Sequence, residues 1–235
     1  MRKKSPGATA PERARTRLRR RKLLTRAEAV EAFRRLATDR PDPRTELIFS
    51  NPFTLLVAVV LSAQATDVSV NRATAHLFRA ADTPQKMVEL GENGVADHIR
   101  TIGLWRMKAR NVVALSRILI EEHGGIVPRD RALLESLPGV GRKTASVVLS
   151  EAFGETTIAV DTHVFRVANR MGLAKETSPD KVEARLMTIT PEPYRRGAHH
   201  WLILHGRYTC LARRPRCQDC VVSDLCLYPE KTQPE

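Results

Sequence analysis

Two residues of this chain, a lysine and an aspartate, could carry out covalent chemistry at a carbon centre. Lys143 follows a glycine-rich turn, and Asp161 lies eighteen residues further along the chain. A lysine amine that has lost its proton is a nucleophile that forms Schiff bases, while a carboxylate can stabilise positive charge and transfer protons. Each residue also has a simpler interpretation, with Lys143 as a phosphate-binding cation and Asp161 as the N-cap of a helix.

The segment 137–145, with the sequence Leu-Pro-Gly-Val-Gly-Arg-Lys-Thr-Ala, positions Lys143. Its proline ends the preceding helix. Its two glycines, Gly139 and Gly141, are expected to adopt backbone angles closed to other residues and to let another backbone come close. A helix is predicted over 142–154. The free N–H groups at the start of this helix, together with two adjacent cations, predict a site for an anion.

The spacing in this turn excludes the common nucleotide-binding motifs. A P-loop needs glycine directly before its lysine, where this chain has Arg142. A dinucleotide-binding fingerprint needs a third glycine, where this chain has Thr144, and no strand is predicted before the turn. The remaining interpretation is a turn between two helices that binds the phosphate backbone of a polynucleotide.

All four cysteines of the chain lie within seventeen residues, spaced C-x6-C-x2-C-x5-C. Four thiolates this close indicate a metal site rather than disulfides, and both zinc and an iron–sulfur cluster accept four cysteines. The loop between the first two cysteines holds three arginines, which suit phosphate contact or form an ordinary solvated surface. The predicted ligands are Cys210, Cys217, Cys220 and Cys226, and the three arginines are Arg213, Arg214 and Arg216.

The other segments are predicted to be helices, and no convincing pair of strands is present, so the predicted class is all-α. Thr25 begins a capping box, and Asn51, Thr83 and Ser178 each precede a proline, which is a helix-start signal. The helix after Asn51 is apolar nearly all round, as expected at the centre of a bundle. The expected helices cover 25–38, 52–64, 67–80, a short stretch after Pro84, 94–100, 106–123, 130–137, 142–154, 161–171, a stretch after Pro179, and 194–208.

The positive charge of the chain is concentrated in its first residues. The net charge is +13, but residues 1–22 hold ten Arg or Lys and one Glu, so the remaining residues carry only +4. We expect this stretch to be a disordered basic arm that touches nucleic acid or a solubilising tail. Organelle targeting is not expected, because no apolar helical face interleaves the charges. No run approaches the roughly 20 apolar residues of a membrane helix, and no secretory signal is expected.

Taken together, these motifs resemble those of the endonuclease III family of DNA glycosylases, within the helix-hairpin-helix superfamily. The similarity extends from about Leu24 to Tyr228 and covers the segments LPGVGRKTA, VDTHVFRV, LSAQATD, HHWLILHGRYTC and the four-cysteine loop, whose spacing is the family's [4Fe–4S] pattern. The resemblance implies two α domains flanking a DNA-binding cleft. A six-helix barrel containing the hairpin would cover 45–155, and a discontinuous iron–sulfur cluster domain would cover 23–44 and 156–235.

The resemblance also implies a function: a bifunctional DNA glycosylase and abasic-site lyase of base excision repair that removes oxidised pyrimidines such as thymine glycol. Lys143 would attack the sugar C1′ of a flipped nucleotide, Asp161 would stabilise the charge developing on the sugar, and β-elimination would nick the strand 3′ to the lesion. Gln64 and Leu104 would enter the duplex, and His163 would lie in the base pocket. Hairpin contacts to DNA are expected from Leu137, Gly139, Gly141, Arg142 and Thr144.

By the same resemblance, the protein would be a monomer that binds double-stranded DNA containing oxidised pyrimidines or abasic sites in a bacterial cytoplasm, associated with the nucleoid and not with a membrane. An adenine glycosylase acting on mispairs shares this fold but normally lacks the hairpin lysine and has an extra C-terminal domain, whereas this chain ends nine residues after Cys226. A non-catalytic DNA-binding module and an electron-transfer protein are alternatives that do not need Lys143. Trp105 stands where the family often has a smaller aromatic residue, which leaves the lesion preference open because it adjoins Leu104.

Overall fold

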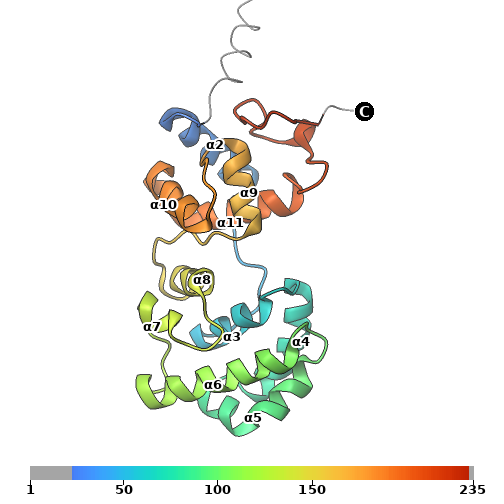
Figure 1. Cartoon of the computed structure of the whole chain (residues 1–235), viewed down its shortest axis with the longest axis vertical. Helices are drawn as coiled ribbons and strands as arrows, with labels where there is room; N and C mark the ends of the chain where they lie inside the picture. The colour runs from blue at the N-terminus through green and yellow to red at the C-terminus, as the bar shows by residue number, and fades with distance from the viewer. Residues whose placement is uncertain (1–22, 233–235) are drawn as a thin grey trace, which may run out of the picture. The chain divides into compact units, whose positions relative to one another are not determined.

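The chain folds into two compact units of helices (Figure 1). The structure, a computed structural model, describes residues 23–232, in which the regular elements are helical and none is a strand. We call 23–43 together with 160–232 the first unit, and Arg44–Ala159 the second unit. The all-α class expected from the sequence is confirmed. The basic arm expected at 1–22 lies outside the described residues.

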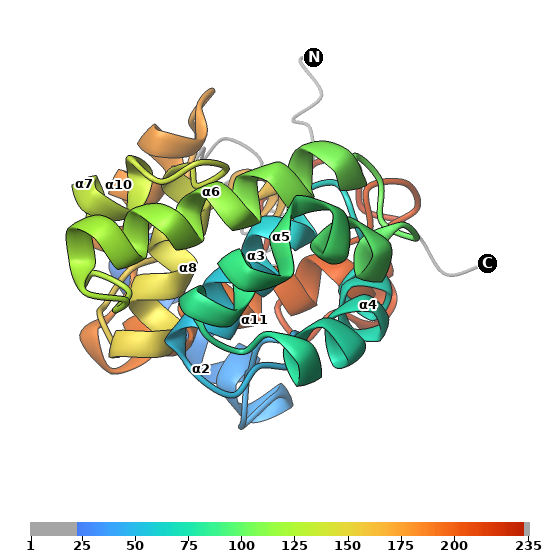
Figure 2. The same cartoon turned by 90° about the horizontal axis from the view of Figure 1, so that it is seen from below.

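The second unit contains a helix that its neighbours surround. Its helices are α3 (Pro52–Ser62), α4 (Asp67–Ala80), α5 (Pro84–Ile99), α6 (Trp105–His123), α7 (Arg131–Glu135) and α8 (Arg142–Phe153). In α3 all residues from Phe53 to Leu61 are buried. A helix that is apolar on all sides needs neighbours on all sides, which α4, α6 and α8 provide. Helices α5 and α6 pack along each other, as both views show (Figure 1, Figure 2).

The second unit ends at Ala159, four residues beyond the barrel expected over 45–155. The reason is that the chain after α8 packs back against this unit. Thr157 Oγ1 donates a hydrogen bond to Ser146 O at 2.6 Å, and both Ile158 and Ala159 are buried. The segment therefore belongs to the apolar core that holds α8 in place.

Local sequence signals set where these helices begin. The Asn51 and Thr83 side chains each accept a hydrogen bond from a backbone N–H in the first turn of the following helix, as their cap positions predict. Several boundaries differ from expectation, and α7 ends at Glu135 rather than at residue 137. Helix α3 ends two residues before Gln64, which is left-handed with φ 55°. The short helices expected between 84 and 100 form one element, α5, interrupted at Gly91 with φ 70°.

The first unit joins an N-terminal helix to the C-terminal part of the chain. Its helices are α2 (Arg26–Asp39), α9 (Thr162–Met171), α10 (Pro179–Ile189) and α11 (Arg195–Tyr208), and two 3-10 turns cover Glu192–Tyr194 and Cys217–Asp219. Helix α11 packs against both α9 and α2. Leu24 N donates to Gly172 O at 2.8 Å, and Trp201 Nε1 donates to Arg40 O at 2.8 Å. None of the described helices combines the length and apolar character needed to cross a membrane.

Candidate functional site

Of the two glycines in the hairpin turn before α8, only one has a backbone angle that favours glycine. Gly139 is left-handed with φ 80°, and a Cβ there would lie 2.9 Å from Asn111 Nδ2. Gly141 is different, because its φ of −103° is available to any residue, so the special angle expected for it is wrong. A Cβ at Gly141 would meet nothing within 4 Å, so this backbone stays open to approach from outside. Leu137 is 2% exposed, so its side chain belongs to the core and only its backbone can reach a ligand.

The first turn of α8 presents positive charge. Gly141 is its N-cap, and no side chain caps the helix. The first amide groups of a helix have no intrahelical acceptor, and the helix dipole adds partial positive charge there. Arg142 and Lys143 are exposed in this turn, and Thr144 is half-buried. An anion approaching Gly141 would therefore meet backbone donors and two cations together, as the sequence predicted.

Two exposed turns in the second unit hold the residues expected to enter the duplex. Gln64 and Leu104 are non-glycine residues with left-handed φ angles of 55° and 61°. This conformation costs roughly 1–2 kcal/mol for an ordinary residue. Leu104 is 52% exposed, so it is not a core leucine. A Cβ on Gly103 would lie 3.9 Å from Gln64 O, which shows that the two turns come together. Strained backbone at an exposed apolar residue is a reason to expect function there.

Asp161 caps α9 in the first unit, as one of its two interpretations predicted. Its Oδ1 accepts hydrogen bonds from His163 N and Val164 N, both at 2.8 Å. The His163 ring is next to Arg166, with Nδ1 3.2 Å from Arg166 Nη2. Helix α11 packs closely here, since a Cβ on Gly206 would lie 2.8 Å from His163 Cβ. The carboxylate is therefore held in one orientation, while Lys143 belongs to the second unit.

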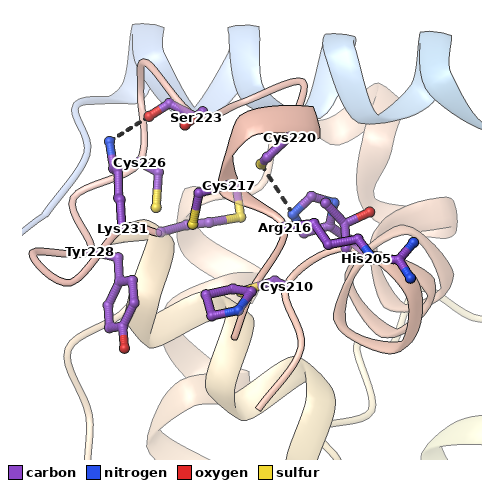
Figure 3. A pocket seen from close by; sticks show the side chains of 12 residues that line it. His205, Cys210, Arg216, Cys217, Cys220, Ser223, Cys226, Tyr228 and Lys231 are labelled. Atoms are coloured by element: carbon purple, nitrogen blue, oxygen red, sulfur yellow. Dashed lines mark hydrogen bonds between the residues drawn. The ribbon is translucent and has the colours of Figure 1, made fainter. Parts of the chain in front are cut away.

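The four cysteines surround one cavity in the first unit (Figure 3). All four are free thiols. The cavity has a volume of about 340 Å³, part of which is open to solvent. No three His, Cys, Asp or Glu side chains among residues 23–232 are grouped tightly enough to hold a metal ion. The donor set around the cavity, rather than a closed ligand geometry, therefore marks this as the cluster site.

The chemistry of these thiols fits a positively charged group. Burial raises the pKa of the Cys220 thiol to about 11 and also raises the pKa of Cys226. Sulfurs in such surroundings need a bound cation to remain thiolates. His205 Nε2 lies 3.6 Å from Cys220 Sγ, and Arg170 Nη1 donates to Cys210 Sγ at 3.7 Å. The Arg170 N–H would support negatively charged sulfur, as would His205 in the tautomer that carries its proton on Nε2.

Two arginines of α9, which were not predicted from the sequence, hold the cluster segment. Arg170 donates to Leu211 O at 2.6 Å and to Ala212 O at 2.9 Å, and its guanidinium lies 4.5 Å from the Tyr228 ring centroid. Arg166 donates to Cys210 O at 3.1 Å. The available signal was their spacing of four residues, which places both on one face of a helix.

The arginines expected to contact phosphate lie in the loop that Arg170 holds. Arg213, Arg214 and Arg216 are all exposed. Arg214 is left-handed with φ 47°. Arg216 also lines the cavity with the cysteines (Figure 3). Its backbone N donates to Thr209 O at 2.9 Å. The loop thus presents three cations from one short, well-connected segment.

Comparison with known proteins identifies the family. Residues 57–192 match the HhH-GPD superfamily of base excision DNA repair proteins, and residues 210–226 match the iron-sulfur binding domain of endonuclease III. Endonuclease III of Escherichia coli (strain K12) is 57% identical over 208 residues, which are 88% of this chain and 99% of that protein. Endonuclease III of Haemophilus influenzae is 52% identical over 210 residues, which are 89% of this chain and 100% of that protein.

Solved structures agree with these relatives. A trapped endonuclease III–DNA covalent intermediate, an estranged-adenine complex, matches with a TM-score of 0.82 at 46% identity, covering 87% of this chain and 96% of that one. A thermostable thymine-DNA glycosylase matches with a TM-score of 0.76 at 26% identity, covering 93% of this chain and all of that one.

The iron-sulfur match begins at the first cysteine and ends at the last, so the group expected at the cavity is confirmed as a [4Fe–4S] cluster. The helix-hairpin-helix glycosylase fold is confirmed by the superfamily match and by the solved structures. With more than half of the aligned residues identical over nearly the whole of both chains, the protein belongs to the endonuclease III family of base excision repair DNA glycosylases with abasic-site lyase activity.

Proposed function

We propose that Lys143 is the nucleophile of this glycosylase, and that its substrates are oxidised pyrimidines, such as thymine glycol, and abasic sites in duplex DNA. The observation that carries the proposal is the position of Lys143, exposed in the first turn of α8 beside the open backbone of Gly141. A phosphate held at that helix end would bring the adjacent sugar to the lysine amine. In this proposal the start of α8 binds the phosphate, and Lys143 is the nucleophile beside it.

In the proposed reaction, the Lys143 amine attacks C1′ of the flipped nucleotide, and the C1′–N bond breaks as the base leaves with a proton. The Asp161 carboxylate stabilises the positive charge on the sugar and assists proton transfer. The sugar ring opens to a Schiff base, which acidifies C2′. Loss of a C2′ proton then expels the 3′ phosphate, and water releases Lys143.

The other predicted residues have positioning roles in this proposal. Gln64 would hydrogen-bond the orphaned base, Leu104 would fill the gap in the stack, and His163 would lie in the base pocket. The second unit would be the helix-hairpin-helix barrel and the first unit the cluster domain. Backbone and side-chain contacts to phosphate would come from Leu137, Gly139, Gly141, Arg142, Thr144, Arg213, Arg214 and Arg216, and the cluster ligands would be Cys210, Cys217, Cys220 and Cys226.

We further propose that the protein works as a monomer in a bacterial cytoplasm, on the DNA of the nucleoid. Supporting this, the curated relatives described above come from bacteria. A monomer is supported by the two units together containing every predicted site residue, so the proposed reaction needs no second copy.

Borohydride trapping tests the nucleophile. The substrate is duplex DNA carrying one thymine glycol. The proteins are cluster-loaded wild type, Lys143→Ala and a control, Lys86→Ala, whose lysine lies in α5 and is paired with Asp82. We expect a covalent adduct with wild type and with the control, and none with Lys143→Ala, which should still bind DNA. An adduct with Lys143→Ala would refute the assignment, and no adduct with wild type would favour a binding module or another lesion.

Two substitutions at Asp161 separate its capping role from its chemical role. Asparagine caps helices as well as aspartate, whereas alanine costs about 1 kcal/mol at an N-cap. We therefore expect Asp161→Asn to keep the thermal stability of wild type but lose most glycosylase activity, and Asp161→Ala to lose both. Full activity in Asp161→Asn would leave capping as the role of this residue.

A further inference from the structure

The first turn of α6 contains an aromatic side chain with two guanidinium groups over its ring. The Arg106 guanidinium lies 4.0 Å from the Trp105 ring centroid, and that of Arg100 lies 5.9 Å from it. The electron-rich face of the tryptophan ring attracts a guanidinium that lies over it. It also restricts a side chain that would otherwise be mobile, so the guanidinium is already oriented before any ligand arrives.

The two guanidinium groups differ in what else they contact. Arg100 Nη2 is paired with Asp97 Oδ1 at 2.6 Å. Arg106 is exposed, and within residues 23–232 its guanidinium makes no hydrogen bond or ion pair. Its N–H donors therefore remain available while stacking holds the group in place. An oriented guanidinium with available donors is suited to bidentate recognition of a phosphate or carboxylate.

The position of Arg106 favours a DNA phosphate as that ligand. It lies two residues after Leu104, in the turn that meets the Gln64 turn. Duplex DNA carries one charge for about every 1.7 Å of its axis. A side chain inserted between bases therefore has backbone phosphates close to residues that neighbour it in the chain.

We propose that Arg106, held on the Trp105 ring, binds a backbone phosphate beside the site of insertion and so positions Leu104 in the duplex. The inference rests on the proposed role of Leu104. It assigns a positioning function to a Trp-Arg pair that lies outside the hairpin, the aspartate segment and the cluster loop. It also gives Trp105 a reason to be tryptophan, since a larger ring offers a better surface for a guanidinium.

Binding titrations across a salt series test the proposal. The ligands are a duplex with a non-cleavable tetrahydrofuran abasic-site analogue and the same duplex without damage. For Arg106→Gln we expect several-fold weaker binding to the analogue, with the slope of log K against log salt reduced by about 0.9, as for one lost phosphate contact. The loss should be smaller on undamaged duplex, where no side chain is inserted. Arg106→Lys should keep the slope but bind more weakly, because the stacked fork is lost.

Arg117→Gln is the matched control, because Arg117 is an exposed arginine of the same helix, about 16 Å away at 1.5 Å per residue. We expect it to change binding much less than Arg106→Gln does. Trp105→Leu should weaken binding, and adding Arg106→Gln to it should cost less than Arg106→Gln costs alone. Equal effects of the Arg106 and Arg117 substitutions, or strict additivity with Trp105→Leu, would overturn the proposal. Borohydride trapping by wild type tests the proposed function separately, since these titrations need no chemistry.

Discussion

Different forces stabilise the second unit and the cluster segment, by which we mean residues 208–232. In the second unit, every residue of α3 from Phe53 to Leu61 is buried. In the cluster segment only Pro215 and Val222 are buried. Its structure comes instead from arginine and backbone hydrogen bonds and from the cysteines around one cavity. The comparison shows that burial of apolar surface supports one part of this enzyme, while ligation must support the other, because short segments without a core rarely stay folded alone.

The largest expected effect comes from removing a cluster ligand. We expect Cys226→Ser to lose the visible absorbance of the cluster and to lose amide protection throughout 208–232, because a structural metal site supplies the folding free energy of such a segment. Protection in α3 should stay at the wild-type level. Hydrogen exchange measured by mass spectrometry resolves both regions at once. Retained amide protection of 208–232 in the cluster-free variant would contradict the claim that ligation stabilises this segment.

A core truncation gives the opposite pattern with a smaller effect. Leu56 in α3 is fully buried, so Leu56→Ala should lower the free energy of unfolding of the second unit by about 3 kcal/mol. The half-buried Leu211 in the cluster segment is the matched control, and Leu211→Ala should change the same quantity by less than about 0.5 kcal/mol. Native-state exchange of α3 amides in both variants makes the comparison. Similar losses in the two variants would contradict the assignment of the core.

The smallest expected effect concerns a charged residue that is buried in the otherwise apolar second unit. Lys108 is 3% exposed, and its Nζ has no hydrogen-bond partner among the described residues. Burial lowers the pKa of Lys108, and an unpaired buried charge is unfavourable. Replacement by an apolar side chain of similar length, Lys108→Met, should therefore raise the free energy of unfolding by about 1 kcal/mol at neutral pH.

The pH dependence of wild type tests the same point. Between the lowered pKa of the folded chain and the ordinary lysine value of about 10.4, the unfolded chain binds more protons than the folded one. The stability of wild type should therefore rise with pH in this interval. Lys108→Met should lack this rise in thermal melts recorded at a series of pH values. A variant that follows the wild-type curve would show that Lys108 does not carry the effect.

Features that depend on neighbouring residues in the chain could be predicted from the sequence. The caps at Asn51 and Thr83 are local, so both helix starts follow from the residue types. The cysteine spacing likewise indicated one site, since four residues so close in the chain cannot lie far apart. Asp161 was expected to cap a helix, to act as a catalytic carboxylate, or to do both, and the structure bears out the cap.

Features that depend on tertiary contacts could not be predicted. The residue types of Gln64 and Leu104 do not predict their left-handed backbone. An unfavourable conformation of this kind persists only where surrounding contacts hold it, and here two turns meet. Lys108 stands four and seven residues before Val112 and Leu115, on the buried face of α6, but a charged residue type gives no reason to expect burial. The bond from Arg170 to Leu211 O joins residues about forty positions apart. Each of these features arises from contacts between residues that are far apart in the chain.

The discontinuous first unit has a consequence for the time course of synthesis. Helix α2 leaves the ribosome before the whole of Arg44–Ala159, whereas the helices that cover it follow afterwards. At about 5–20 residues per second, this delay is on the order of ten seconds. During that time the second unit can complete its own core, while the apolar face of α2 waits uncovered. A cell making this enzyme therefore holds, for that interval, a nascent chain with an uncovered apolar helix face, and the interval ends when α11 has been synthesised and packs against α2.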